Sequence, residues 1–429
     1  MASEHGVRPI RLTIADDLRR NRVTVFFRAL LALPLMVWLA AWGLAALVVG
    51  VVNWVATLAL GRSPSALHCF LARFVRYATH AFAYLNLTAG PFPGFVGKPG
   101  YPIDLEIDPP ARQRRWSVAI RFVLAIPAMA LLSVLAGYGA NIYGGVNSRV
   151  TISCLLSMSA FLGWFSALAR GRMPRGLRDM AAYALSYGAQ FWAYMLMLTD
   201  RYPSSDPLTA IGPLPVRNGP VRLEAGGGPR RRRLTVFFRV LLAFPHLVWL
   251  TLWGILALGA AVINWIVTLI RGTPPLRIHS ILARYLRYQA HVASYLFLVG
   301  NPFPGFAGAE GSYPIELHFS GAERQNRWTV LFRLVLVVPA FFILGIYNSL
   351  LILAAFLGWF AALVTGRMPL GLGNAGALVI GYAAQTYAYL LIVTGAYPYS
   401  GPAEPRPAPA FPRLPPPLPV PAPPPPVAV

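Results

Sequence analysis

The sequence has few charged residues and very few acidic ones. Only 12% of its 429 residues are charged, against about 25% in soluble globular proteins, while 56% are hydrophobic. This balance excludes a typical cytosolic enzyme, a disordered chain and a small secreted domain held by disulfides. Together with a mean hydropathy of +0.56, it predicts an integral membrane protein.

Cysteine and lysine are nearly absent as well. The two cysteines, Cys69 and Cys154, lie in apolar segments, so we interpret them as small buried hydrophobes and not as a disulfide or metal pair. Lys98 is the only lysine, so arginine supplies almost all of the formal net charge of +23. The arginines cluster just outside the apolar segments, where anionic headgroups attract them. This placement favours membrane anchoring over nucleic-acid binding.

The fourteen acidic residues all lie outside the apolar runs, which limits the available chemistry. Ion-coupled transporters usually carry a carboxylate inside the membrane. The sequence also has neither a phosphate-binding G-x-x-x-x-G-K-[ST] loop nor an H-E-x-x-H metal motif. We therefore expect a protein without enzymatic activity, cofactor or metal site.

What the sequence does contain is one unit repeated four times. Residues 22–34, RVTVFFRALLALP, return at 233–245 as RLTVFFRVLLAFP, and weaker copies stand at 115–127 and 327–339. In each copy an arginine precedes a proline by six residues. Starting 25 residues before each proline is a short alternating segment, PIRLTI, PIDLEI, PVRLEA or PIELHF. Such alternation is typical of a β-strand.

The four units form a duplicated pair in the order A-B-A-B. The first and third close with a PFPGF segment, and the second and fourth close with Tyr-Pro. We divide the chain into unit A1 over 1–100, unit B1 over 101–204, a linker and unit A2 over 205–312, unit B2 over 313–400, and a Pro-rich tail over 401–429. We expect the tail to be a disordered polyproline II segment and a weak candidate for partner binding.

These motifs resemble those of a known bacterial family. A Pro-Val/Ile strand, a TVFFR…LLA(I/F)P stretch, a Gly-Arg-x-Pro turn and a closing Tyr-Pro are similar to membrane proteins of the domain of unknown function 4389 family. The resemblance covers nearly all of residues 9–400 in four copies. It implies an inner-membrane protein without a known activity, and it supplies no catalytic residues.

Each unit contains an apolar run that is too long for one ordinary membrane span. Between Val23 and Leu60 there are 38 residues with a single charge, whereas a spanning helix needs about 20 residues. The second copy has 17 more residues in this run, many of them polar or glycine, which favours an exposed turn. We therefore predict a helical hairpin in each run, turning near Gly43, Gly254 and Asn348, and about eight spans in all.

A third segment of each unit has the pattern of an amphipathic helix. In unit A1, Arg73, Arg76, Tyr77, His80 and Tyr84 fall on one helical face, and unit A2 repeats the pattern 211 residues later. We predict that this helix lies in the membrane interface. Alternatively it spans the bilayer with its polar stripe against other helices, which raises the count to about twelve spans.

The predicted fold class is an all-α integral membrane protein, with tandem helical hairpins, amphipathic interfacial helices and short β-strands at the cytoplasmic face. We expect a multi-pass protein of the inner membrane whose N-terminus and C-terminal tail are cytoplasmic. If all four strands share this side, they can pair as one four-stranded patch, with Arg11 and Arg222 against Asp104, Glu106 and Glu316.

Repeated arginines give the sharpest functional hypothesis. A guanidinium donates bidentately to phosphate, so the hypothesis is that these arginines form a ring that binds anionic lipid headgroups or another phosphorylated amphiphile. The candidate residues are Arg28, Arg121, Arg239, Arg333, Arg73, Arg76, Arg284 and Arg287. We favour the interpretation that they only anchor the protein by snorkelling toward the phosphates, since any bilayer provides such phosphates.

We expect a non-enzymatic membrane scaffold or lipid-interacting protein, with anionic membrane lipids as its partners. The alternative is a passive channel or uncoupled transporter for anionic solutes or lipids, which the pseudo-symmetric repeats suggest.

Overall fold

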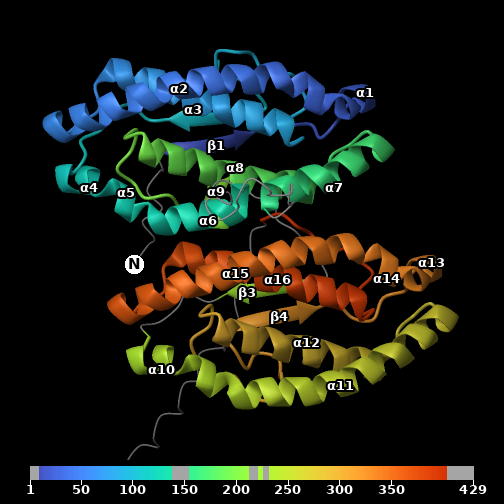
Figure 1. The fold of residues 1–429 in the computed structure, drawn as a ribbon. Helices are drawn as coiled ribbons and strands as arrows, with labels where there is room; N and C mark the ends of the chain where they lie inside the picture. Colours follow the sequence, from blue (N-terminus) through green and yellow to red (C-terminus); the bar gives the residue numbers. More distant parts are fainter. Residues whose placement is uncertain (1–8, 138–153, 212–220, 226–230, 403–429) are drawn as a thin grey trace, which may run out of the picture.

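The computed structural model describes residues 9–137, 154–211, 221–225 and 231–402. The chain forms two halves of the same design, one stacked on the other (Figure 1). The first half comprises β1 (Ile10–Ile14), α1 (Arg22–Phe26), α2 (Arg28–Leu60), α3 (Ser65–Leu85), β2 (Ile103–Ile107), α4 (Arg115–Ala119), α5 (Arg121–Leu124), α6 (Ile126–Ala136), α7 (Leu155–Arg170), α8 (Arg175–Met195) and α9 (Pro207–Ala210). The second half comprises β3 (Val221–Ala225), α10 (Arg233–Phe237), α11 (Arg239–Arg271), α12 (Leu276–Leu296), β4 (Ile315–Phe319), α13 (Arg327–Leu331), α14 (Arg333–Leu336), α15 (Val338–Thr365) and α16 (Leu370–Leu390).

The apolar run of a unit is one long helix and not a hairpin. Helices α2 and α11 each run for 33 residues through Gly43 and Gly254, and α15 continues through Asn348. The predicted turns are therefore wrong, and so is the count of about eight spans that rested on them. A lone glycine costs a helix interior only about 1 kcal/mol, and these copies have no polar stretch that would break the helix.

Unit B1 differs because its long helix is divided into α6 and α7. Helix α6 ends at Gly137, which has a φ of +78°, and α7 begins at Leu155. The inserted residues that we interpreted as an exposed turn, from Gly139 to Val150, lie outside the described ranges. Three helical stretches of the described residues are long and apolar enough to cross a membrane, namely Arg28–Leu60, Arg239–Arg271 and Arg333–Thr365.

A helical hairpin does form, one element later in each unit. Gly61, with a φ of +72°, ends α2 and reverses the chain, so that α3 packs back along α2. The same pairing joins α7 with α8, α11 with α12 and α15 with α16. We call α3, α8, α12 and α16 the second helices. The predicted amphipathic segment is therefore a helix. Its polar face packs under the strands in units A1 and A2, because Arg76 and Arg287 donate to the strand carbonyls of Leu105 and Leu317.

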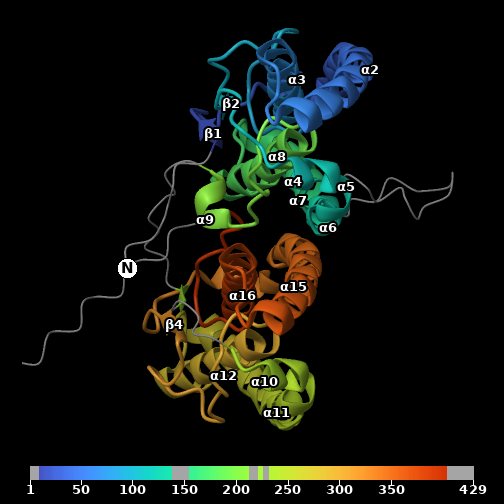
Figure 2. The same ribbon diagram turned by 90° about the vertical axis from the view of Figure 1, so that its left-hand side faces the viewer.

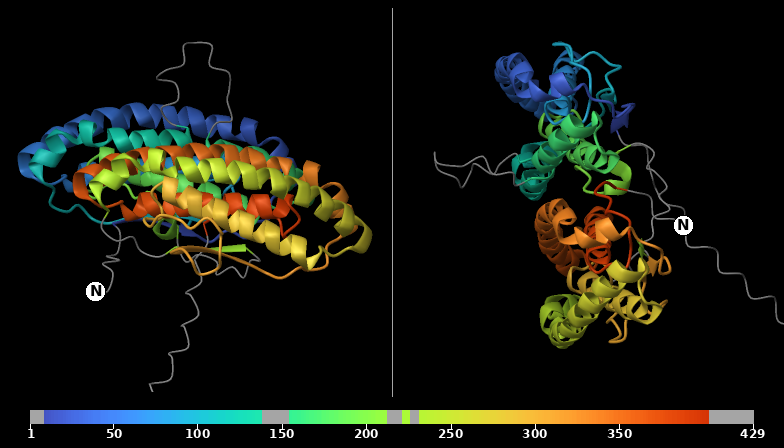
Figure 3. Two further views of the ribbon diagram at one scale, coloured as in Figure 1. Left: turned by 90° about the horizontal axis from the view of Figure 1, so that it is seen from below. Right: turned by 90° about the vertical axis from the view of Figure 1, so that its right-hand side faces the viewer.

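The elements form three layers (Figure 2). The long helices, α2, α6 with α7, α15 and α11, line one side, the second helices lie in the middle, and the strands cover the other side. Seen from below, the long helices overlap and their axes run in similar directions (Figure 3). The two halves meet where α15 packs against α6 and α7. Between them, the Asn374 side-chain amide also donates to Asp206 at 3.1 Å.

The strands form two separate antiparallel pairs, β1 with β2 and β3 with β4. The predicted four-stranded patch is wrong, because each pair lies over the second helices of its own half. Within the first pair the predicted charge pairing is confirmed, since Arg11 stands opposite Glu106 and Arg11 Nε donates to it at 3.1 Å. Within the second pair Arg222 stands opposite His318 and not Glu316.

Each strand covers a helix of the other unit in its half. Strand β1 begins unit A1 but packs on α8 of unit B1, and β2 begins unit B1 but packs on α3 of unit A1. The second half repeats this exchange, with β3 on α16 and β4 on α12. Units A and B therefore complete each other.

The long helices have their apolar side chains outside and a narrow buried stripe inside. In α2 the buried stripe includes Asn53 and Thr57, while Leu44, Leu47 and Val48 are 65–70% exposed. Helix α11 repeats this pattern. Soluble monomers rarely expose apolar patches of this extent, so the long-helix layer has the surface of a membrane-associated protein.

We predict that Gly308→Ala destabilises the fold by about 2 kcal/mol or more, because of left-handed strain and overpacking. Gly308 has a φ of +55°, and a Cβ there would lie 2.4 Å from the carbonyl oxygen of Arg284. Thermal unfolding in detergent measures the effect. Gly305→Ala is the matched control, since nothing lies within 4 Å of its added Cβ. Equal unfolding midpoints for the two variants would contradict this explanation.

Candidate functional site

Four of the candidate arginines are buried near the start of the long helix of each unit. Arg28, Arg121, Arg239 and Arg333 are at most 3% exposed. Each follows a short break between helices, as at Phe27 between α1 and α2. The break turns the arginine toward the end of the second helix in the same unit.

The guanidinium groups donate to backbone carbonyls at that helix end. Every unit has such a bond: Arg28 Nη2 donates to Gly90 O at 3.1 Å, Arg121 Nη1 to Tyr194 O at 2.9 Å, Arg239 Nη1 to Gly300 O at 3.3 Å, and Arg333 Nη1 to Thr394 O at 3.2 Å. Arg121 also forms an ion pair with Asp200 at 2.9 Å. Tyr194 lies in the last turn of α8, where the final carbonyls have no partner within the helix and carry its negative dipole end. Gly90, Gly300 and Thr394 lie in the turns that follow α3, α12 and α16, so there the arginine satisfies carbonyls of the turn.

A tyrosine ring covers each of these guanidiniums. The cation-to-centroid distance is 4.1 Å for Arg28 over Tyr84, 4.4 Å for Arg121 over Tyr194, 4.4 Å for Arg239 over Tyr295 and 4.0 Å for Arg333 over Tyr389. Stacking on an aromatic face stabilises a desolvated cation by about 2 kcal/mol. Every unit therefore holds one arginine between a helix end and a ring.

An unusual backbone conformation presents these carbonyls. The second helices end next to Leu87, Met197, Leu298 and Ile392, whose φ angles lie between +58° and +62°. This left-handed region costs a residue other than glycine about 1–2 kcal/mol. The turn it makes brings carbonyl groups toward the arginine, and the arginine compensates for the cost.

The other four candidate arginines divide between buried and exposed positions. Arg287 is buried, and its Nε lies 2.7 Å from Glu316 and donates to Leu317 O. Arg76 is half-buried in the corresponding place. Arg73 and Arg284 are exposed, and their side chains have no hydrogen bond or ion pair with other described residues. The eight residues therefore do not form one ring, and only Arg73 and Arg284 are open to a ligand.

Sequence reasoning missed a polar cluster that joins the strands to the second helices. His80 Nε2 lies 3.0 Å from Asp104 on β2, and Arg76 lies 3.4 Å from the same carboxylate. Burial raises the pKa of Asp104, but hydrogen bonds from the backbone N–H groups of Gly100 and Leu105 and from His80 outweigh it and hold the pKa below its usual value. Burial lowers the pKa of His80, so a neutral imidazole donates to an ionised carboxylate.

Unit A2 has a looser form of this cluster. His291 Nε2 lies 3.7 Å from Glu316, too far for a hydrogen bond, and neither ring nitrogen of the buried His291 has a partner. The sequence shows these histidines and acidic residues, but it does not show that a histidine of an A unit pairs with an acidic residue of the following B unit. Among the described residues no group of three or more His, Cys, Asp or Glu side chains could hold a metal ion.

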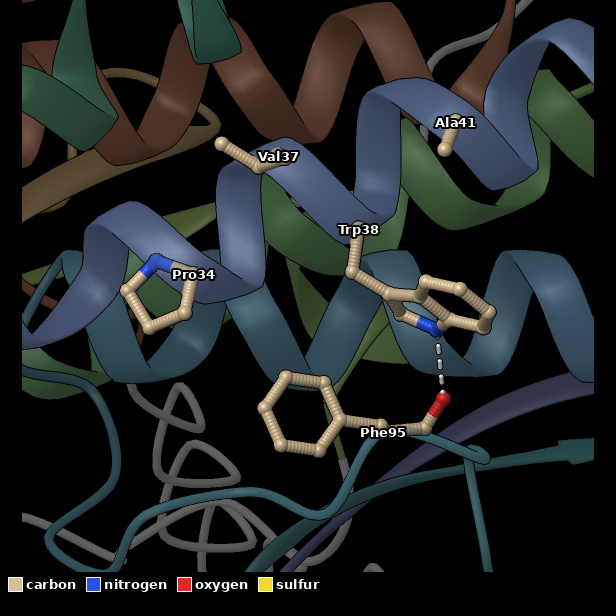
Figure 4. A pocket seen from close by; sticks show the side chains of 5 residues that line it. All are labelled: Pro34, Val37, Trp38, Ala41 and Phe95. Atoms are coloured by element: carbon tan, nitrogen blue, oxygen red, sulfur yellow. Dashed lines mark hydrogen bonds between the residues drawn. The ribbon is translucent and has the colours of Figure 1, made fainter.

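The loop after each A-type second helix is attached to the long helix by a tryptophan. Trp38 Nε1 donates to Phe95 O at 2.8 Å beside a shallow apolar hollow that Pro34, Val37 and Ala41 also line (Figure 4). Trp249 makes the corresponding bond to Phe306 O at 3.1 Å. The PFPGF segment that closes the A units is therefore a structural loop held on the apolar side.

Exposed arginines stand at both ends of the long-helix layer. In the first half, Arg19 and Arg172 form a backbone bridge at one end, and Arg62 and Arg112 form one at the other end. All four side chains are exposed. The second half has exposed arginines at the equivalent positions Arg367 and Arg324, and close to the other two equivalent positions at Arg232 and Arg271. The site therefore consists of an apolar layer with a cationic group at each end.

The fold and this surface define a membrane-associated helical protein built from tandem repeats. The chain belongs to the family described as Domain of unknown function (DUF4389), whose model matches residues 22–95, 151–205, 233–307 and 327–400. The predicted family and its four tandem copies are thus confirmed. No curated protein and no solved structure matches the chain.

We predict that Tyr84→Leu lowers the free energy of unfolding by about 0.5–2 kcal/mol, because Arg28 loses its cation–π contact. Tyr84→Phe keeps the ring face and is the matched control, with little change expected. Thermal unfolding in detergent compares the two variants. If the Phe variant is destabilised as much as the Leu variant, the ring face is not what stabilises the buried arginine.

Proposed function

We propose that this protein is a non-enzymatic membrane scaffold that lies flat in the cytoplasmic leaflet of the inner membrane. In this arrangement the long helices lie in the lipid, the strands lie in water, and the arginines at the two ends bind anionic headgroups. The observation that carries the proposal is the layer order, with apolar helices on one side and charged strands on the other.

The position of the strands along the helices supports this orientation. Gly43, midway along α2, faces Phe74 of α3. Close to Phe74 in the same helix, Arg76 Nε donates to Leu105 O in the middle of β2 at 2.9 Å. The strands therefore flank the middle of the long helices and not their ends. A helix α2 that crossed the bilayer would bring β2 to the depth of the bilayer centre.

The cost of that alternative is high. The side chains of Arg11 and Glu106 on the strand face are 41% and 55% exposed, and a single charged residue at the bilayer centre costs at least about 2.5–3.5 kcal/mol. In the flat orientation the same side chains are in water. The apolar side chains of the long helices are then in the acyl region, about 5–10 Å below the headgroups, as in interfacial amphipathic helices.

The arginines at both ends of each long helix agree with the flat orientation. A helix of 33 residues is about 50 Å long, and the hydrocarbon core is about 30 Å thick. Spanning helices tend to have their arginines on one side of the membrane, whereas Arg19 and Arg62 mark opposite ends of the first unit. Lying flat brings both ends to the same headgroup layer, where each arginine gains about 1 kcal/mol from anionic lipid.

Cysteine labelling measures the orientation. We expect single cysteines at Arg19, Ser65 and Thr13, which mark the two ends of α2 and the strand face, to react with a membrane-impermeant maleimide only from the cytoplasmic side. Leu47→Cys, on the apolar face of α2, is the buried-in-lipid control and should stay unreactive. Cys69 and Cys154 are first replaced by alanine.

The spanning alternative gives a different labelling pattern. In that case the cysteines at positions 19 and 65 react from opposite sides of the membrane, and the proposal of a flat scaffold is wrong.

Vesicle flotation tests the binding of anionic headgroups. We expect the triple change of Arg62, Arg112 and Arg115 to Gln to weaken association with phosphatidylglycerol-containing vesicles about fivefold per arginine, with no effect on vesicles of phosphatidylcholine alone. Arg11→Gln, on the strand face, removes a charge that does not meet the membrane and is the control. Changing Arg73 and Arg284 to Gln shows whether these two exposed arginines take part. An equal loss per removed charge with the Arg11 variant would point to net charge alone.

A passive channel for anions stays an alternative prediction from the repeats. Anion flux into vesicles that contain the purified protein measures it, because a flat scaffold produces no flux.

A further inference from the structure

A groove of about 350 Å³ lies in the second half, between α12, α15 and α16. Its floor is apolar and buried, with Leu286 and Ala290 from α12 and Val379 and Ile380 from α16. Its volume falls in the range of small-molecule sites, about 300–1,000 Å³. The groove is separate from the buried arginines and from the exposed arginines at the ends of the layer.

Two amide side chains line this groove, whose other lining residues are apolar apart from Tyr387. Gln289 of α12 and Asn348 of α15 line it, and neither forms a hydrogen bond with another described residue. Asn348 is exposed on a long helix, and so is its neighbour in the groove, Gly345. The groove therefore opens toward the long-helix layer, which is the side that faces lipid. An amide without a hydrogen-bond partner in hydrocarbon costs several kcal/mol. A ligand that accepts hydrogen bonds from both amides would remove this cost.

The first half has a larger side chain in place of the groove alanine, and it has alanines in place of the two amides. Counting 211 residues back, Ala293 in the groove corresponds to Phe82 and Gln289 corresponds to Ala78. Counting from the prolines of the B units, Asn348 corresponds to Ala136. The two amides and the small alanine are thus specific to the second half, although the helices around them are repeated.

We propose that this groove binds one glycerolipid, with an acyl chain along the apolar floor and the ester carbonyls accepting hydrogen bonds from the amides of Gln289 and Asn348. This inference rests on the proposed membrane orientation. An amide N–H₂ group donates and an ester carbonyl only accepts, so the pairing is complementary. At the depth of flat interfacial helices, the polar part of a glycerolipid lies next to its first methylene groups, as the amides lie next to the floor.

The choice of lipid tests the hydrogen bonds directly. The purified protein in detergent is titrated with diester phosphatidylglycerol and with its diether analogue, which lacks the ester carbonyls, and bound lipid is counted by native mass spectrometry. We expect one saturable site that binds the diester about tenfold more tightly, as two lost hydrogen bonds predict.

Two variants take residues from the first half. Ala293→Phe places a ring where Phe82 stands and is expected to abolish the saturable site. The double variant Gln289→Ala and Asn348→Ala is expected to reduce diester affinity about tenfold and to leave diether affinity unchanged. Phe82→Ala, in the other half, is the control and leaves the site intact. Thermal unfolding in detergent confirms that each variant is folded.

Three outcomes would overturn the inference: no saturable site, equal affinity for diester and diether, or unchanged binding by Ala293→Phe. These results are distinguishable from a failure of the proposed orientation. The detergent titration needs no bilayer, and cysteine labelling reports the orientation in the membrane independently of Gln289 and Asn348.

Discussion

A buried guanidinium at the carboxyl end of a neighbouring helix is the contact on which the architecture depends. Arg28 and its three counterparts donate to carbonyls in the last turn of the second helix or in the turn that follows it. They also compensate for the left-handed residue that presents those carbonyls. Arginine suits this place because its planar group can donate to several carbonyls and stack on a tyrosine at once. The same cation therefore fixes the start of the long helix against the end of the second one.

Further polar contacts repeat around this point, some within the B units and others between units A and B. Gln113 and Gln325 donate to the left-handed residues Met197 and Ile392 of the B units. Trp54 of unit A1 donates to Val118 of unit B1, and Trp164 donates back to Val25. The tryptophans lie on long helices whose outer surfaces are apolar, and the glutamines lie in the loops before α4 and α13. Because lipid offers no hydrogen bonds, polar groups of this kind are the groups that specify how such helices pair.

The sequence was sufficient to predict the local strands and helices and the fourfold repeat. It was insufficient to predict how these elements pack together. The alternation in PIRLTI and PIDLEI predicted β1 and β2, and the positions of Arg73, Arg76 and His80 predicted α3. The predicted turn at Gly43 was wrong because it rested on the length of the apolar run and on the insertion in unit B1, which the other units lack. A helix that lies flat also has no upper limit of one bilayer thickness. The burial of Arg28 was not predictable either. A snorkelling arginine and a carbonyl-bound one have the same neighbours along the chain, and only tertiary structure distinguishes them.

The exchange of strands between units has a consequence for how this gene can be divided. A break between residues 211 and 221 leaves both strand pairs and their supporting helices intact. A break near residue 100 separates α3 from the strand that covers it and leaves β1 without the helix on which it packs. The smallest self-sufficient piece is accordingly two copies long. Homologues with an odd number of copies would need a second chain to supply the missing strand.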